Sequence, residues 1–300
     1  MTATSEIIVL GGTGMLGHKL FQILQSTFPD TVTVIRKRRD DHPYRNIPLF
    51  QSANVIDSID VLAFENLAEI LRDRRPQFVI NCIGVIKQRD EAISRVSMIA
   101  LNALLPHRLA DLCASWGGRL IHISTDCVFS GHRGMYTEED ASDADDLYGR
   151  TKYLGEVSTQ NALTLRTSII GRELTTHRSL LDWFLSNNGK RVSGYRKSIY
   201  SGVTTNQLAQ VVTHIISNHP NLNGLYQVAS EPIAKCDLLN LLRDAFGCKI
   251  EIDQIDGEDV DRSMSGLKLR EAIGYACPPW PVLVRQLAED PTPYDVWLRC

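Results

Sequence analysis

The 300-residue sequence has no long apolar run and no marked excess of either charge. A membrane-spanning helix needs roughly 18 consecutive apolar residues, whereas the best candidate, Phe78–Ile86, is short and is interrupted by Asn81 and Gly84. The 32 lysines and arginines against 35 aspartates and glutamates give a formal net charge of −3. Nucleic-acid-binding proteins usually carry a strongly basic face. We therefore expect neither a membrane span nor a nucleic-acid interface.

The cysteines lack the order that a disulfide or zinc framework needs. There are 7 of them, an odd number, and no two form a C-x-x-C pair. No histidine stands at a zinc-ligand spacing, so the sequence predicts no metal site. The first residues, Met1–Glu6, have neither the basic nor the apolar region of a signal peptide. Free thiols without a leader predict a location in the reducing cytoplasm.

What the sequence does have is the composition of a globular protein, with 43% hydrophobic and 22% charged residues. That balance excludes global disorder. Buried strands are predicted at 7–10, 32–35, 78–80, 120–123 and 163–166, and helices at 15–27, 64–74, 99–114 and 147–160. Strands that alternate with helices indicate an α/β fold, a doubly wound parallel sheet covered on both faces.

After Gly171 the alternation becomes less regular. Helices at 206–218 and 236–245 and a strand at 225–229 are still predicted, and prolines interrupt the chain beyond Gly257. We expect a main domain made of residues 1–170 and 203–229. Residues 171–202 and 230–300 would then form a small, partly interleaved C-terminal lobe that binds the substrate.

Four glycines follow the first predicted strand directly. Gly12, Gly14 and Gly17 fit the pattern G-x-G-x-x-G, and Gly11, Gly14 and Gly17 fit G-x-x-G-x-x-G. Glycine lets the backbone turn tightly and approach a diphosphate, which the helix N-terminus attracts through its free N–H groups. A plain structural turn is the alternative. The strand and helix around the loop favour a dinucleotide site in a Rossmann-type domain.

A basic cluster follows the second predicted strand. Many dinucleotide sites place an acidic residue about 20 positions after the loop, where it binds the ribose 2′-hydroxyl. Here Arg36 stands 19 positions after Gly17, and Lys37, Arg38 and Arg39 follow it. Guanidinium groups can bind a 2′-phosphate that a carboxylate would repel. The cluster therefore favours NADPH over NADH, although NADH and a solvated charge run remain alternatives.

Tyr148 and Lys152 stand four positions apart, on one face of a predicted helix. A phenol has a pKa near 10 and is a poor acid–base catalyst unless a cation stabilises its phenolate, which Lys152 could do. Thr125 follows the predicted strand 120–123, with Ser124 as an alternate. A hydroxyl at the end of a central parallel strand points into the crevice where such folds bind ligands.

Together these motifs resemble the extended short-chain dehydrogenase/reductase superfamily and, within it, the dTDP-4-dehydrorhamnose reductase family. The resemblance covers most of the chain. It is carried by the glycine loop, by Tyr148 and Lys152, and by the run Ser124–Phe129. Further matching segments are Asn81–Gly84, Asn102, Leu165–Ser168, Gly224–Ala229 and Asp261–Ser263.

The resemblance implies a reductase for a nucleotide-linked 4-keto-6-deoxy sugar, serving the synthesis of cell-surface polysaccharide. Tyr148 would protonate the oxygen at C4, Lys152 would bind the nicotinamide ribose and Thr125 would orient the carbonyl. The implied NADPH contacts are Gly11, Thr13, Gly14, Met15 and Leu16 at the diphosphate, Asp60 and Val61 at the adenine, and Cys82, Ile83 and Gly84 at the adenosine ribose and beyond. The resemblance does not fix the oligomeric state, and a homodimer is one alternative.

Two departures from the family pattern fall where a sugar would be recognised. Cys127 stands where the family has tyrosine, and Ile169 stands where it usually has tryptophan. The expected substrate contacts are Thr125, Asp126, Cys127, Tyr148 and Ile169. A reductase or epimerase of a UDP-4-keto-6-deoxy-N-acetylhexosamine is therefore an alternative. A non-catalytic NADP-binding regulatory subunit is another.

Several other residues have two interpretations. We expect His122 to be a core histidine rather than a ligand, and Cys127 a packing thiol rather than a nucleophile. Asn102 could bend its helix or serve as a relay, or it could be a plain core residue. Trp280 could cover the substrate lobe or anchor the tail. The pair Arg196–Lys197 and Arg262 could bind a nucleotide diphosphate or be surface charge.

Overall fold

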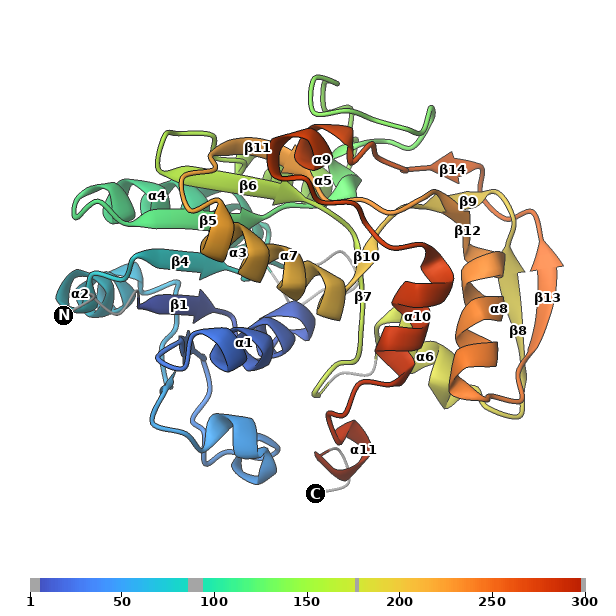
Figure 1. The fold of residues 1–300 in the computed structure, drawn as a ribbon, viewed down its shortest axis with the longest axis horizontal. Coiled ribbons are helices and arrows are strands. Elements are labelled where there is room, and N and C mark those ends of the chain that lie inside the picture. The colour runs from blue at the N-terminus through green and yellow to red at the C-terminus, as the bar shows by residue number, and fades with distance from the viewer. Residues whose placement is uncertain (1–5, 86–93, 176–177, 298–300) are drawn as a thin grey trace.

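The computed structural model describes residues 6–85, 94–175 and 178–297. Within them the central layer is a seven-stranded sheet of order β11-β6-β5-β4-β1-β2-β3 (Figure 1). Its strands are β1 (Ile7–Leu10), β2 (Val32–Val34), β3 (Val55–Ile56), β4 (Phe78–Asn81), β5 (Arg119–Ile123), β6 (Ala162–Arg166) and β11 (Gly224–Gln227). Every neighbouring pair is parallel. The predicted doubly wound α/β fold is therefore confirmed, and all seven carboxyl ends meet at one edge.

Helices cover both faces of the sheet, and the side chains of β1 alternate between the two cores. Ile7 and Val9 pack with α1 (Met15–Thr27), α7 (Thr205–Asn218) and α9 (Leu267–Ile273). Ile8 and Leu10 pack with α2 (Phe64–Arg74) and α4 (Leu105–Ala114). Figure 1 shows α1 and α7 side by side on one face. Burial on both faces explains why β1 is apolar at every position.

The helix predicted at 99–114 begins earlier, at Arg95, and contains a π-helical turn. It consists of α3 (Arg95–Ile99), a π-helical turn (Ala100–Leu104) and α4. Asn102 lies in the π-helical turn and is fully buried, where its Oδ1 accepts from Val85 N at 2.8 Å. Its Nδ2 donates to Val85 O at 3.1 Å. Asn102 is thus a core residue within a π-helical turn, which agrees with the core interpretation.

The helix predicted at 147–160 is too long. It forms as α5 (Leu147–Leu154) with Gly155 as its C-cap. Both backbone groups of Val157 are bonded to Thr164 Oγ1, the N–H at 3.0 Å and the carbonyl at 2.7 Å. These bonds hold the backbone out of the helix and lead it into β6.

A second apolar core lies away from the sheet, at one end of the molecule (Figure 1). It is built by α6 (Leu180–Ser186), α8 (Lys235–Phe246) and α10 (Trp280–Ala288). Trp280 is 3% exposed and its Nε1 donates to Glu231 O at 2.7 Å, so it anchors this core. The strands here pair as β8 (Arg191–Tyr195) with β13 (Glu251–Ile255), β9 (Ser198–Tyr200) with β12 (Ile233–Ala234) and β14 (Val260–Asp261), and β7 (Ile169–Ile170) with β10 (Val203–Thr204).

The predicted division into two domains stays a prediction. The separate core supports a distinct lobe, but two segments assigned to that lobe pack elsewhere. Helix α9 belongs to the core of the sheet. Helix α11 (Tyr294–Trp297) packs against Phe21 of α1 and the short turns η1 (Tyr44–Asn46) and η2 (Pro48–Phe50). No helix in the described ranges has both the length and the apolar character to cross a membrane.

Candidate active site

The glycine loop joins β1 to α1 in a conformation that only glycines allow. Gly11 has a φ of +85°, and a Cβ added at Gly17 would lie 2.1 Å from Gly11 O. The N-cap of α1 is Gly14, which has no side chain to cap the helix, and the first turn carries no acidic residue. The N–H groups of that turn are therefore left for an anion, which fits a dinucleotide diphosphate. Leu16 is 5% exposed in the core, so only its backbone could take part.

The residues predicted for the adenosine end lie together at the same edge of the sheet. Arg36 and Lys37 are exposed just after β2. The segment after β3 runs beside them, because Ser58 N donates to Lys37 O at 3.4 Å. That segment continues into Asp60 and Val61. The structure thus brings the basic pair close to the predicted adenine contacts.

The basic cluster is smaller than predicted, because Arg39 is bound within the protein. Its Nε lies 3.3 Å from Asp57 Oδ2, and its guanidinium donates to Ser52 O at 2.9 Å. The hydrogen bond from Arg39 N, together with the guanidinium, lowers the pKa of Asp57. Arg38 lies 3.8 Å from Asp40 at the surface. Arg36 and Lys37 are exposed like Arg38, but no ion pair of theirs is found among the described residues.

Thr125 and Tyr148 meet at the carboxyl end of β5. Thr125 caps a short 3-10 turn, η4 (Asp126–Val128): its Oγ1 accepts from Cys127 N at 3.2 Å and donates to Asp126 Oδ1 at 3.1 Å. Helix α5 lies against this turn, since a Cβ added at Gly149 would be 2.2 Å from Cys127 O. The close approach brings Tyr148 beside Thr125, whose side chain acts to lower the pKa of the phenol.

Burial raises the pKa of Tyr148, and the neighbouring Thr125 side chain only partly offsets the rise. This direction is opposite to the lowering expected from a neighbouring cation. The ammonium of Lys152 is instead held by Ile123 O, at 2.7 Å from Nζ. The phenol therefore keeps its proton at neutral pH, which is the form that a proton donor requires.

Lys152 is buried beside the end of β4. Burial lowers its pKa to about 8, and the nearby carboxylate of Glu156 opposes that change. A Cβ added at Gly84 would lie 3.9 Å from Lys152 Nζ, which places this predicted ribose contact next to the ammonium. Cys82 lies close as well, and burial raises the pKa of its thiol to about 12. The structure thus assembles three of the predicted residues around one point.

A buried ion pair supports the site from behind, and the sequence interpretation missed it. The Arg166 guanidinium binds both carboxylate oxygens of Glu156 at 2.7 Å, with side chains only 2% and 8% exposed. Glu156 also accepts from Ser124 Oγ at 2.7 Å, so Ser124 serves this network. The available signal was an arginine in an otherwise apolar strand, which needs a buried partner.

The predicted substrate side is polar and buried. Burial raises the pKa of Asp126, while Arg262 acts in the opposite direction. Arg262 also donates from Nε to Phe129 O at 2.9 Å, so it belongs to this region. Tyr200, which the sequence interpretation missed, lies close to this region, because burial raises the pKa of its phenol and the Asp126 carboxylate adds to the rise. Among the residues that the structure describes, its buried hydroxyl has no hydrogen-bond partner.

The remaining candidates lie as follows. Burial raises the pKa of Cys127 to about 12, which agrees with a packing thiol. Ile169 follows Ser168, is half-buried and packs against the core of the sheet. The pair Arg196–Lys197 is surface charge, because Arg196 is paired with Asp256 at 2.6 Å and Lys197 with Asp259 at 3.8 Å.

His122 is a core histidine, as expected. It is fully buried, and Asn81 Nδ2 lies 3.2 Å from its Nδ1. Burial and the charge of Lys152 hold its pKa well below the usual range. Among the residues that the structure describes, no group of three or more His, Cys, Asp or Glu side chains is arranged to hold a metal ion.

Comparison with known proteins places this architecture. Over 157 residues the chain is 31% identical to methionine adenosyltransferase 2 subunit beta from Mus musculus, covering 50% of this chain and 41% of that protein. It is 27% identical over 154 residues to dTDP-4-keto-6-deoxy-D-glucose reductase from Streptomyces niveus, covering 51% of this chain and 46% of that protein. The matched region thus spans less than half the length of these curated relatives.

Solved structures share the fold over nearly the whole chain. The dTDP-4-dehydrorhamnose reductase from Bacillus anthracis, in complex with NADP, gives a TM-score of 0.77 at 19% identity over 94% of this chain and 98% of that one. The Bordetella bronchiseptica enzyme WbmG, in complex with NAD, gives 0.75 at 15% identity over 96% and 94%. Residues 5–249 match the family model described as the RmlD substrate binding domain. The chain therefore belongs to this dTDP-4-dehydrorhamnose reductase family within the extended short-chain dehydrogenases/reductases.

Proposed function

We propose that this protein is an NADPH-dependent reductase of the 4-keto group of a nucleotide-linked 6-deoxy sugar, serving the synthesis of cell-surface polysaccharide. One observation carries the proposal. Tyr148 lies beside Thr125 at the end of β5, and the Lys152 ammonium lies one turn further along α5 beside Gly84. The glycine loop opens at the same edge of the sheet.

The dinucleotide would be bound along this edge. The first turn of α1 would take its diphosphate, and Arg36 with Lys37 would bind the adenosine 2′-phosphate. Lys152 and Gly84 would hold the nicotinamide ribose. When bound, NADPH supplies the hydride for the reduction. The complexes of the Bacillus anthracis enzyme with NADP and of WbmG with NAD support a dinucleotide as the ligand of this fold.

Three side chains would act on the sugar carbonyl. Tyr148 would donate its proton to the carbonyl oxygen as C4 becomes an alcohol carbon, and its raised pKa keeps that proton available at neutral pH. Thr125 would hold the same oxygen by a hydrogen bond. In the structure the Thr125 hydroxyl donates to Asp126 Oδ1, so its hydrogen would turn from Asp126 to the carbonyl oxygen when the sugar binds. Lys152, charged below pH 8, would favour the negative charge that develops nearby.

The sugar itself is a separate part of the proposal. Cys127 and Ile169 replace two aromatic residues of the family pattern, and Asp126 and Arg262 lie beside them. Smaller side chains at these positions would leave room for an N-acetyl group. A UDP-4-keto-6-deoxy-N-acetylhexosamine, reduced or epimerised, is therefore the alternative to dTDP-4-dehydrorhamnose.

A non-catalytic NADP-binding subunit is the second candidate function. It is favoured by the 31% identity to a protein named as a subunit of methionine adenosyltransferase. The joint presence of Thr125, Tyr148 and Lys152 favours the enzyme, because a purely regulatory subunit needs no proton donor.

The test is turnover of NADPH with a panel of dTDP- and UDP-linked 4-keto sugars, followed by the absorbance of the reduced nicotinamide. Tyr148→Phe should lower kcat by about 10²–10⁴-fold, because it removes the proton donor. Tyr153→Phe is the matched control, since Tyr153 lies on the same helix and is 45% exposed. NADPH binding without turnover of any sugar would favour the regulatory subunit instead.

A further inference from the structure

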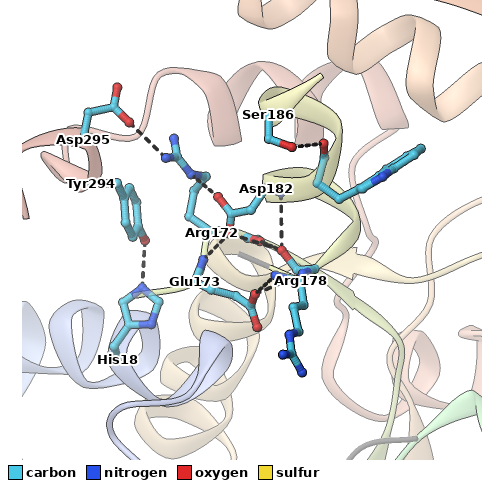
Figure 2. Close-up of polar contacts among 11 residues, drawn as sticks. His18, Arg172, Glu173, Arg178, Asp182, Ser186, Tyr294 and Asp295 are labelled. Atoms are coloured by element: carbon cyan, nitrogen blue, oxygen red, sulfur yellow. Dashed lines mark hydrogen bonds and ion pairs between the residues drawn. The ribbon is translucent and has the colours of Figure 1, made fainter. Parts of the chain in front are cut away.

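A chain of hydrogen bonds connects the 290–297 segment to the glycine loop. Tyr294 Oη lies 2.9 Å from His18 Nε2, and His18 Nδ1 lies 2.8 Å from Gly14 O. Figure 2 shows the first of these contacts, which joins Tyr294 to His18, 276 positions earlier in the sequence. The Gly14 carbonyl can only accept, so His18 Nδ1 carries the proton and Nε2 accepts from the Tyr294 hydroxyl.

The chain lies in a dry part of the protein. His18 is fully buried and Tyr294 is 5% exposed. Burial lowers the pKa of His18 to about 4, so the imidazole is neutral at physiological pH and the direction of the chain is fixed. Buried hydrogen bonds are stronger than exposed ones, and a buried group that loses its partner costs free energy.

The Tyr294 ring is itself held between two cations. Lys19 lies on α1, and its Nζ is 5.4 Å from the centroid of the Tyr294 ring. The guanidinium carbon of Arg172 is 5.1 Å from the same centroid. Lys19 is fixed by Asp290 at 2.7 Å, and Arg172 by Asp182 at 2.7 Å (Figure 2 shows the second pair). Contacts from three parts of the chain therefore fix the place of the hydroxyl.

The Gly14 carbonyl accepts two hydrogen bonds, from His18 N at 3.2 Å and from His18 Nδ1 at 2.8 Å. The same peptide group carries the N–H of Met15, which begins α1. Hydrogen bonds in a chain polarise one another, so each bond accepted by the carbonyl makes this N–H a stronger donor. The bonds also fix the plane of the peptide, and thus the direction of its N–H.

We propose that His18 and Tyr294 are positioning residues for the diphosphate of the dinucleotide, acting through the Gly14–Met15 peptide. The inference rests on the proposed function, because it requires a dinucleotide at the glycine loop. Neither side chain touches the cofactor in this arrangement. Both would act by holding the peptide group that does.

Tyr294→Phe tests this, because it removes one hydroxyl and keeps the ring between its cations. We would measure the Kd of NADPH, of 2′-phospho-ADP-ribose, which has the diphosphate, and of adenosine 2′-monophosphate, which does not. The first two should rise on the order of 3- to 10-fold, as expected for one lost hydrogen bond. The Kd of the monophosphate should stay unchanged. The KM for NADPH should rise by the same factor, while kcat at saturating NADPH is retained.

Two further variants separate positioning from general stability. Val296→Ala alters the same helix at a side chain that is 62% exposed, and it should leave all three Kd values unchanged. His18→Asn keeps an amide N–H that can donate to Gly14 O, so it should bind NADPH more tightly than His18→Leu does. A purely structural role would give no such rescue.

The outcomes are distinct. Equal losses for the diphosphate and monophosphate ligands in Tyr294→Phe, or a lower melting temperature with all three Kd values unchanged, would overturn the positioning role alone. Failure of the unaltered protein to bind NADPH or 2′-phospho-ADP-ribose would overturn the proposed function and this inference together.

Discussion

At the scale of single residues, burial is the main cause of the pKa shifts in the candidate site. It raises the pKa of Tyr148 and Asp126 and lowers that of Lys152 to about 8, so all three shift toward their neutral forms. At pH 7 the phenol is protonated and the lysine still carries its charge. This combination suits the donation of a proton to a carbonyl better than its removal from an alcohol.

Arg36→Ala provides a test of the cofactor preference. We expect the Kd of NADPH to rise by about 10–100-fold, because a hydrogen bond between charged groups contributes about 1.5–3 kcal/mol. The Kd of NADH should stay the same. Arg38→Ala is the control, since Arg38 is also exposed but lies beside Asp40. Equal effects of Arg36→Ala on both dinucleotides, measured by fluorescence titration, would contradict the assignment of the 2′-phosphate.

The sequence could identify a residue when its partners stand close to it in the sequence, and could not when they stand far away. Thr125, Tyr148 and Lys152 belong to short motifs that can be recognised locally. Arg39 was assigned wrongly, because Asp57, which binds it, stands 18 positions later. The role of His18 could not be predicted at all, because its partner Tyr294 is 276 positions away and no local pattern links the two.

At the scale of elements, the site depends on how closely α5 packs against η4. The contact between Gly149 and Cys127 O leaves no space for a side chain. Tyr148 precedes Gly149 directly, so any outward shift of the helix would carry the phenol away from Thr125. The geometry of the predicted catalytic pair is thus set by one close backbone contact.

Gly149→Ala should therefore lower both kcat and the free energy of unfolding. The added methyl group would force α5 outward, and a displacement of about 1 Å can cost on the order of 10²-fold in rate. Overpacking should also lower the free energy of unfolding by about 1–3 kcal/mol. Leu154→Ala, at a position 62% exposed near the end of α5, should change neither quantity much. Retention of full kcat by Gly149→Ala at unchanged stability would show that the contact is not critical.

Elements with a strong apolar period were predicted well, and short ones were not. β1, α1 and α2 begin and end as predicted, since each has a continuous apolar run or face. The π-helical turn could not be detected, because the apolar period continues through it. β7, β10, β12 and β14 have only 2 residues each, which is too short for any periodicity.

At the scale of the whole molecule, two buried neutral histidines make the fold sensitive to acid. Burial lowers the pKa of His18 to about 4 and that of His122 well below its usual range. Both would have a pKa near 6.5 in the unfolded chain, which therefore binds more protons as the pH falls below that value. The free energy of unfolding decreases through this window. For His18 the full loss is about 3 kcal/mol.

Urea unfolding at pH 7 and at pH 5 measures this effect. We expect stability to fall between the two, and His122→Asn to reduce the difference, because the amide oxygen can still accept from Asn81 but does not titrate. The raised pKa values of Asp126 and Glu138 act in the opposite direction, and they are common to both proteins. An identical difference in the variant would mean that His122 is not responsible.

The packing of α7 against α1 has a consequence for biosynthesis. Helix α1 leaves the ribosome early, whereas α7, which covers its apolar face, is encoded almost 180 residues later. Until then Leu16, Leu20 and Leu24 have no partner on that side. At roughly 5–20 residues per second, a nascent chain would stay in this state for some ten seconds or more. The first half of this fold is thus a candidate client for a chaperone that binds apolar helices during translation.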